Sequence, residues 1–277
     1  ILGLRRRGFF IPYRYADRLA RPGDRPPIAA LEALFRAAEP AFRAHLDTIE
    51  RLAAELEALD RAPLASAKPP AKPGPPAPRW RQDWFPRLDA AAAYAMVRAR
   101  RPARIVEIGC GHSTRFMARA VGDGGLDTEI TAIDPAPRAA LADLPVRRTH
   151  RPLHQAMEEA EHCAPGDFLF IDSSHLLMPG TDVELALTRL LPALPAGALV
   201  HFHDVFLPDD YPVGWAWRGY NEQLGVAALL LGGERYRPLF ASHYVMSRMA
   251  GALAQTVVAR LPLVEGAVES SLWLEKR

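Results

Sequence analysis

The chain has 277 residues, of which 49 % are hydrophobic and 24 % are charged, and its formal net charge at pH 7 is +2. This composition is typical of a globular protein with a substantial core, and the small net charge excludes a strongly basic surface for nucleic acid. No apolar run approaches the roughly 18 residues of a membrane span. Two cysteines without metal or disulfide spacing, and no visible signal peptide, predict a cytoplasmic protein.

Residues 26–61 have the spacing of a long amphipathic helix. Pro40 interrupts the stretch and is expected to kink the helix or to start a second one. The apolar stripe can either pack on its own domain or pair with a second copy, so a homodimer through this arm is one expectation. The positions of the stripe are Ile28, Leu31, Phe35, Ala38, Phe42, Ile49, Leu52, Leu56 and Leu59.

The composition divides the chain into three parts. Residues 1–62 form an N-terminal segment with the helical arm, and residues 63–79 form a Pro-rich linker that should be extended. Residues 80–277 form the main domain, which we expect to bind a small molecule.

Helical and strand patterns alternate along the main domain. Helices are predicted at 88–101, 113–121, 137–144, 153–161, 181–191 and 217–231, and strands at 104–108, 129–133, 146–149, 168–171 and 198–202, followed by a β-rich stretch at 236–247. Such alternation predicts an α/β fold with a doubly wound, Rossmann-like sheet. Ligands of this fold bind at the carboxyl ends of the strands.

A glycine turn follows the first strand, in the sequence "EIGCGHST". Gly109 and Gly111 have no Cβ and allow a ligand to approach the backbone, and the helix that begins near Ser113 directs free N–H groups to the same place. Asp134 ends the next strand, where an acidic side chain can accept both hydroxyls of a ribose.

Two ligands compete for this turn. A nicotinamide dinucleotide needs a third glycine, where Thr114 stands, and the negative charge of Glu107 would disfavour its pyrophosphate. S-Adenosylmethionine has no phosphate and carries an amino group that suits a carboxylate. The turn therefore favours S-adenosylmethionine, with an NAD(P)-dependent oxidoreductase and a non-catalytic, cofactor-binding interaction protein as the alternatives.

The motifs "VEIGCGHST", "ITAIDP", "FLFIDSSH" and "GALVHFHDVFLP" resemble the successive strand-end motifs of class I S-adenosylmethionine-dependent methyltransferases. The resemblance covers about residues 80–250 and is strongest to the bacterial branch near the catechol-type O-methyltransferases. It implies a seven-stranded sheet whose last strand is antiparallel, which we assign to the β-rich stretch at 236–247. It also implies a set of cofactor-binding residues, namely Glu107, Gly109, Gly111, His112, Ser113, Asp134 and Asp172.

A second group of ionisable residues follows the later strands. Asp172 and His175 come after one strand, and His203 and Asp204 after the next. In catechol-type relatives, acids at these strand ends bind a divalent cation, but Val205 stands where a third ligand is usual. The resemblance thus implies Asp172 and Asp204 as metal ligands, and the third ligand is either lost or replaced by His203 or His175. We predict a metal site made of Asp172, His203 and Asp204.

The same group allows two readings without a metal. A histidine that is neutral near pH 7 could take the proton of the methyl acceptor, or the group could be a structural hydrogen-bond network. We predict a methyltransferase acting on a small-molecule hydroxyl, or less favourably an amine, with His203, His175 and Asp172 as catalytic residues. The aromatic segment 209–223 could wall the acceptor pocket or seat the next helix, with Asn221 and Glu222 as acceptor contacts.

Overall fold

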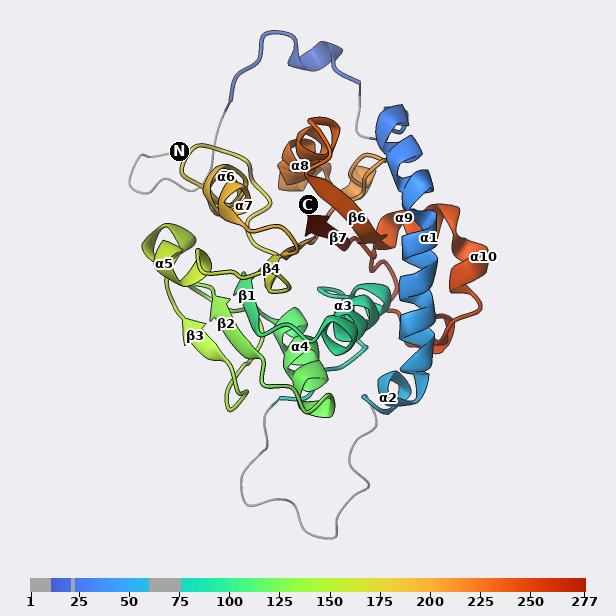
Figure 1. The fold of residues 1–277 in the computed structure, drawn as a ribbon. Coiled ribbons are helices and arrows are strands. Elements are labelled where there is room, and N and C mark those ends of the chain that lie inside the picture. The colour runs from blue at the N-terminus through green and yellow to red at the C-terminus, as the bar shows by residue number, and fades with distance from the viewer. Residues whose placement is uncertain (1–10, 21–22, 60–75) are drawn as a thin grey trace.

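The computed structural model describes residues 11–20, 23–59 and 76–277. Its centre is a seven-stranded sheet with helices on both faces (Figure 1). The last strand runs antiparallel to both of its neighbours, while the strands from β3 to β5 are parallel. The predicted fold class is therefore confirmed. The order along the sheet is β3 (Arg147–Thr149), β2 (Glu129–Ile133), β1 (Arg104–Ile108), β4 (Phe168–Ile171), β5 (Leu199–Phe202), β7 (Leu272–Lys276) and β6 (Tyr236–Ala241).

The central strands are apolar on both faces. Every residue of β4 and β5 is buried, as expected of parallel strands that are covered by helices on both sides. On one side, α3 (Arg87–Arg100) packs along α4 (His112–Asp123). The opposite side holds α6 (Asp182–Leu185), α7 (Leu191–Ala193) and α8 (Glu222–Leu231) (Figure 1). The sheet thus leaves its carboxyl edge as the place for a site.

The predicted arm is a helix that packs on its own domain. Helix α1 spans Ala29–Arg51 and continues through Pro40, and the short α2 follows at Ala53–Ala58. Its apolar stripe lies along β6 and against α3. Phe42 packs edge-on against Phe240, with ring centres 6.1 Å apart. The stripe is thus covered by the same chain, and a homodimer through the arm stays a prediction.

Several predicted elements differ in the structure. Residues 137–144 form bends and a turn instead of the predicted helix. The helix predicted at 217–231 is split by Gly219, whose φ of 67° ends the 3₁₀ helix η4 (Val213–Arg218). The antiparallel last strand was misplaced as well, since it is Leu272–Lys276 rather than the stretch at 236–247.

The remaining elements are short. They are η1 (Ala16–Arg18), η2 (Leu153–Gln155), α5 (Met157–Ala160), the π-helical turn η3 (Ala186–Leu190), α9 (Ser242–Arg248), α10 (Ala250–Leu253) and η5 (Val257–Arg260). Among the described residues, no helix combines the length and the apolarity that a bilayer crossing requires. The predicted linker 63–79 lies mostly outside the described residues, so the division into three parts stays a prediction.

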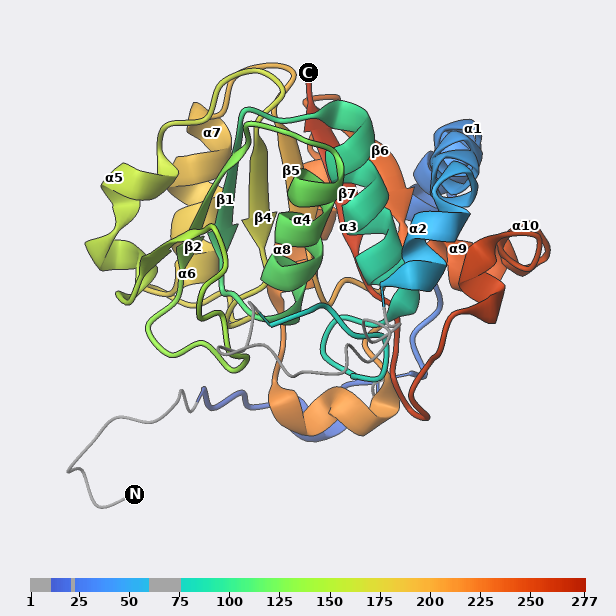
Figure 2. The same cartoon turned by 90° about the horizontal axis from the view of Figure 1, so that it is seen from below.

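Residues 11–20 run beside η4 at the carboxyl edge of the sheet (Figure 2). The backbone N–H of Ile28 donates to the carbonyl of Pro208. Arg25 Nε donates to Asp210 Oδ2 at 2.7 Å. These contacts attach the start of the arm to the loop that follows β5.

Candidate active site

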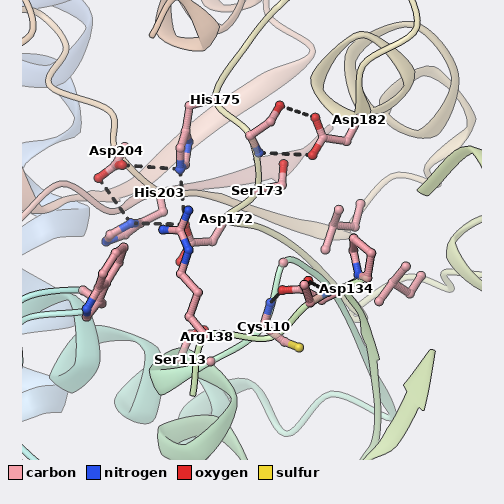
Figure 3. Close-up of a pocket in the computed structure, with 18 of the residues that line it drawn as sticks. Cys110, Ser113, Asp134, Arg138, Asp172, Ser173, His175, Asp182, His203 and Asp204 are labelled. Carbon is pink, nitrogen blue, oxygen red and sulfur yellow. Dashed lines mark hydrogen bonds and ion pairs between the residues drawn. The ribbon is translucent and has the colours of Figure 1, made fainter. Parts of the chain in front are cut away.

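A cavity of about 510 Å³ opens at the carboxyl ends of β1, β2, β4 and β5 (Figure 3). This is the place where a doubly wound sheet binds its ligands. The walls come from the glycine turn, from the loops after the four strands, from residues 83–85 and from the η4 segment. The predicted motifs therefore meet around one space.

Gly109 is required by the path of the chain. Its φ is +78°, and a Cβ at this position would lie 1.8 Å from the carbonyl oxygen of Asp172. Gly111 is different, because its backbone is extended and a Cβ would make only an ordinary 3.7 Å contact with Ala139. Both glycines line the cavity. Only Gly109 is needed to bring the turn against the end of β4.

Glu107 is fully buried and does not line the cavity. Its carboxyl group accepts hydrogen bonds from the hydroxyls of Ser113 and Thr114, the latter at 2.6 Å. Burial raises the pKa of Glu107 to about 8, against the opposing effect of these two bonds. The group is thus mostly uncharged at neutral pH, which weakens the charge argument against a pyrophosphate. Its observed role is to fasten the start of α4 to β1.

Asp134 does face the cavity, at the end of β2. Its two oxygens accept the backbone N–H groups of Cys110, at 3.0 Å, and of Ala136, at 2.7 Å. An ionised carboxylate has lone pairs for about four hydrogen bonds. Asp134 can therefore hold the two loops together and still accept bonds from a ligand. His112 and Ser113 line the same part of the cavity.

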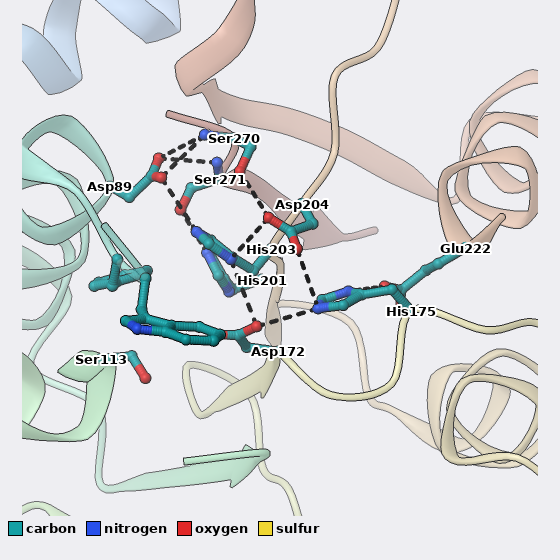
Figure 4. A network of polar contacts seen from close by, with 12 residues as sticks. Asp89, Ser113, Asp172, His175, His201, His203, Asp204, Glu222, Ser270 and Ser271 are labelled. Atoms are coloured by element: carbon teal, nitrogen blue, oxygen red, sulfur yellow. Dashed lines mark hydrogen bonds and ion pairs between the residues drawn. The ribbon is translucent and has the colours of Figure 1, made fainter. Parts of the chain in front are cut away.

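Asp172, His175, His203 and Asp204 come together at the other end of the cavity (Figure 4). His175 Nε2 lies 3.4 Å from Asp172 Oδ1 and 3.3 Å from Asp204 Oδ2. His203 Nδ1 lies 3.5 Å from Asp172 Oδ1 and 3.4 Å from Asp204 Oδ1. The four side chains form a ring in which acids and imidazoles alternate, which we call the acid–imidazole cluster.

The backbone of this cluster is unusual. His175 has a φ of 57° and Asp204 a φ of 55°. Non-glycine residues seldom adopt this left-handed conformation, and where they do they gather at functional sites. The two loops are thus held in a conformation that turns these side chains toward the cavity.

Each imidazole has a second carboxylate behind it. His175 Nδ1 bonds to Glu222 Oε2 at 2.9 Å, and His203 Nε2 bonds to Asp89 Oδ2 at 3.2 Å. Asp89 also accepts the backbone N–H groups of Ser270 and Ser271. Glu222 is buried and does not line the cavity, so it does not contact an acceptor there as we predicted.

Asp89 is not among the predicted site residues. This residue is fully buried in α3, far along the chain from the strand-end motifs. One feature of the sequence could have pointed to it. Asp89 is an acid inside the apolar run "LDAAAAYAMV", where a buried charged side chain needs a partner.

The carboxylates around the cluster shift the pKa of both imidazoles upward. Burial lowers the pKa of a histidine, but here the carboxylates outweigh it and raise the pKa of His175 and His203 well above the usual value. Burial likewise opposes the ionisation of Asp172, and the imidazoles more than offset it, so its pKa lies below the usual range. These directions disfavour the predicted neutral histidine, which stays a prediction. The physical reason for the upward shift is that both nitrogens of each ring face carboxylate oxygens, which favour the protonated ring.

His201 takes no part in the cavity. Its ring stacks on Phe170 with the centres 3.7 Å apart, and Nε2 bonds to the hydroxyl of Ser271 at 2.8 Å. Burial holds its pKa well below the usual value. This histidine is thus a neutral part of the core.

The η4 segment and Tyr220 form one wall of the cavity. Of the two roles predicted for residues 209–223, a pocket wall or a seat for the next helix, this position agrees with the first. Trp215, Arg218 and Tyr220 line the cavity. The guanidinium of Arg218 stacks over Trp215 at 3.9 Å from the ring centre. On another wall, Arg138 stacks over Trp84 at 4.6 Å. Two stacked cations therefore border the cavity.

In the described parts of the chain, no three His, Cys, Asp or Glu side chains are arranged to hold a metal ion. The metal predicted at Asp172, His203 and Asp204 stays a prediction, although these side chains do meet.

The structure resembles several solved methyltransferases at low identity. The SAH-bound methyltransferase PaMTH1 of Podospora anserina is 15 % identical, with 98 % of this chain and 99 % of that chain covered and a TM-score of 0.43. The Mg–SAM form of cmcI is 16 % identical, with 79 % and 90 % covered and a TM-score of 0.43. MycE in complex with Mg, SAH and mycinamycin VI is 16 % identical, with 71 % and 55 % covered and a TM-score of 0.39. Values this low carry no inference about function.

The sequence comparisons are more specific. No curated protein matches the chain. Residues 106–205 match a family model described as "Methyltransferase domain". This stretch contains the four strand ends that surround the cavity. The strand ends that border the cavity therefore lie in a stretch with the sequence pattern of a methyltransferase domain.

Proposed function

We propose that the protein is an S-adenosylmethionine-dependent methyltransferase that acts on a small-molecule hydroxyl, or less favourably on an amine. The observation that carries the proposal is a single cavity with two ends. One end holds the glycine turn and Asp134, and the other holds the acid–imidazole cluster. The match of residues 106–205 to a methyltransferase domain supports the same reading.

The cofactor end is suited to a polar nucleoside. Asp134 is placed to accept the ribose hydroxyls. His112 Nδ1 and Ser173 Oγ are buried without a hydrogen-bond partner among the described residues, and both residues line the cavity. Buried polar atoms normally have partners. A ligand with its own donors and acceptors would supply them.

The acid–imidazole cluster is suited to an acceptor that loses a proton. S-Adenosylmethionine, when bound, supplies an electrophilic methyl group on a sulfonium. The carboxylate of Asp204 can take the proton of an acceptor hydroxyl, and the charged rings of His175 and His203 can stabilise the oxygen as it becomes negative. Asp172 lies between the two ends, where its negative charge favours a sulfonium.

A metal-assisted version is a second candidate. It is favoured by one observation, the carboxylates behind both imidazoles, because metal-binding histidines usually donate their other N–H in this way. Asp172, His203 and Asp204 would hold the ion. Calorimetric titration with MnCl₂, ZnCl₂ and MgCl₂ tests it. Saturable binding that Asp204→Asn abolishes would support the metal-assisted version, and absence of binding would support the acid–base version.

Cofactor choice is tested by calorimetry with S-adenosylhomocysteine and with NAD. We expect S-adenosylhomocysteine to bind at one site and Asp134→Ala to weaken it by about tenfold or more, because hydrogen bonds to a charged group are lost. Asp127→Ala is the matched control, since Asp127 is exposed and lies outside the cavity. Binding of NAD alone would contradict the proposal and favour an oxidoreductase.

A further inference from the structure

Arg218 presents a positive charge to the cavity and has no anionic partner within the part of the chain that the structure describes. It stands at the end of η4, and its guanidinium is held between aromatic rings, at 3.9 Å from the centre of Trp215 and 5.4 Å from that of Tyr220. All three residues line the cavity. Stacking fixes the plane of a guanidinium and leaves its N–H edge free to bind an oxyanion with two bonds.

The hydrogen bonds of Arg218 are incomplete. None of the ion pairs among residues 11–20, 23–59 and 76–277 includes it. Its one side-chain bond is a long contact of 3.5 Å from Nη1 to the hydroxyl of Tyr220. Its Nε is buried and has no partner among the described residues. Arg218 is half-buried, and a charge that is partly removed from water is stabilised by an opposite charge, so a ligand anion is the natural complement.

The position of Arg218 separates it from the cofactor end. Tyr220, which contacts it, packs against His175 of the acid–imidazole cluster, with ring centres 4.7 Å apart. The other stacked cation, Arg138, follows β2 in the loop that begins at Asp134, which is the end assigned to the cofactor. Arg218 thus stands on the side where an acceptor would lie.

We infer that the methyl acceptor is an anionic small molecule whose carboxylate or phosphate group binds Arg218, with its neighbouring planar or apolar part against Trp215. The inference rests on the proposed function, because it assigns the acceptor half of that site. It narrows the substrate class from any small hydroxyl compound to one that carries an oxyanion as well.

The test uses three probes that share one ring: benzoate, phenyl phosphate and benzamide. Each is titrated by calorimetry into the full chain saturated with S-adenosylhomocysteine. We expect one of the two anions to bind at least about tenfold more tightly than the neutral amide, as charged hydrogen bonds imply. The anion that binds more tightly shows whether the anionic group of the acceptor is a carboxylate or a phosphate. Arg218→Gln should remove this preference, and Arg218→Lys should keep part of it.

Arg189→Gln is the control, because Arg189 is an exposed arginine outside the cavity. Equal affinities for all three probes, no binding of any probe, or a preference that survives in Arg218→Gln would overturn the inference. If Arg218→Gln weakened the binding of S-adenosylhomocysteine as much as it weakened the binding of the preferred anion, Arg218 would belong to the cofactor site. The inference would then be wrong. Failure of the unaltered protein to bind S-adenosylhomocysteine would contradict the proposed function itself, which keeps the two failures distinct.

Discussion

Replacing Gly109 by alanine is expected to lower the free energy of unfolding by about 3 kcal/mol or more, the range of severe backbone and packing defects. Two effects combine here. The positive φ is unfavourable for alanine, and its Cβ would overlap the carbonyl oxygen of Asp172 at 1.8 Å. Backbone atoms cannot swing aside as a flexible side chain can, so β1 and β4 must separate at the carboxyl edge.

Gly125→Ala is the matched control for this prediction. Gly125 also has a positive φ, of 53°, but no atom lies within 4 Å of an added Cβ. The difference between the two variants in urea-induced unfolding therefore measures the overlap alone. Equal losses would show that the turn and β4 are not in the close contact described. We further expect Gly109→Ala to lose affinity for S-adenosylhomocysteine, because the turn and Asp172 border the same cavity.

The second large effect is a pH-dependent gain in stability from Glu107→Gln. Burial raises the pKa of Glu107 from 4.5 to about 8, so the neutral carboxyl contributes stability that is fully present below pH 4.5 and is lost as the pH rises to about 8. Glutamine stays neutral and retains an oxygen for the hydroxyl bonds. We expect the variant to match the unaltered protein near pH 5 and to be more stable by about 3 kcal/mol at pH 8.

Urea unfolding between pH 5 and pH 9 measures this effect. The difference between variant and unaltered protein isolates Glu107, because all other titrating groups are common to both. Glu265→Gln serves as the control, since this side chain is exposed. A difference that does not change with pH would mean that Glu107 is ionised in the folded protein, and it would restore the charge argument against a pyrophosphate.

The strand ends were predictable because they are encoded locally. The apolar runs that form β1, β2, β4 and β5, each followed by a turn or an ionisable residue, placed the site at the correct edge of the sheet. The meeting of Asp172 with Asp204 follows from that geometry alone. A parallel sheet brings the carboxyl ends of neighbouring strands together.

What escaped prediction depends on contacts between distant residues. Asp89 meets His203 across 114 positions of the chain, and no local pattern announces such a pair. Burial lowers the pKa of His203 and its carboxylate neighbours, Asp89 among them, raise it, so the upward shift also depends on distant contacts. The strand β7 is short and lies in the last residues of the chain, beyond the stretch to which the resemblance extends.

The position of β7 bears on when the site is completed during synthesis. This strand lies between β5 and β6, although it follows β6 along the chain, and the residues just before it, Ser270 and Ser271, bind Asp89 behind His203. When a nascent chain has left the ribosome as far as β6, it still lacks β7, the strand that joins β5 to β6. The edge of β5 that pairs with β7 stays unpaired until β7 itself has been made. The acid–imidazole cluster therefore gains its support behind His203 later in synthesis than the strands that carry it.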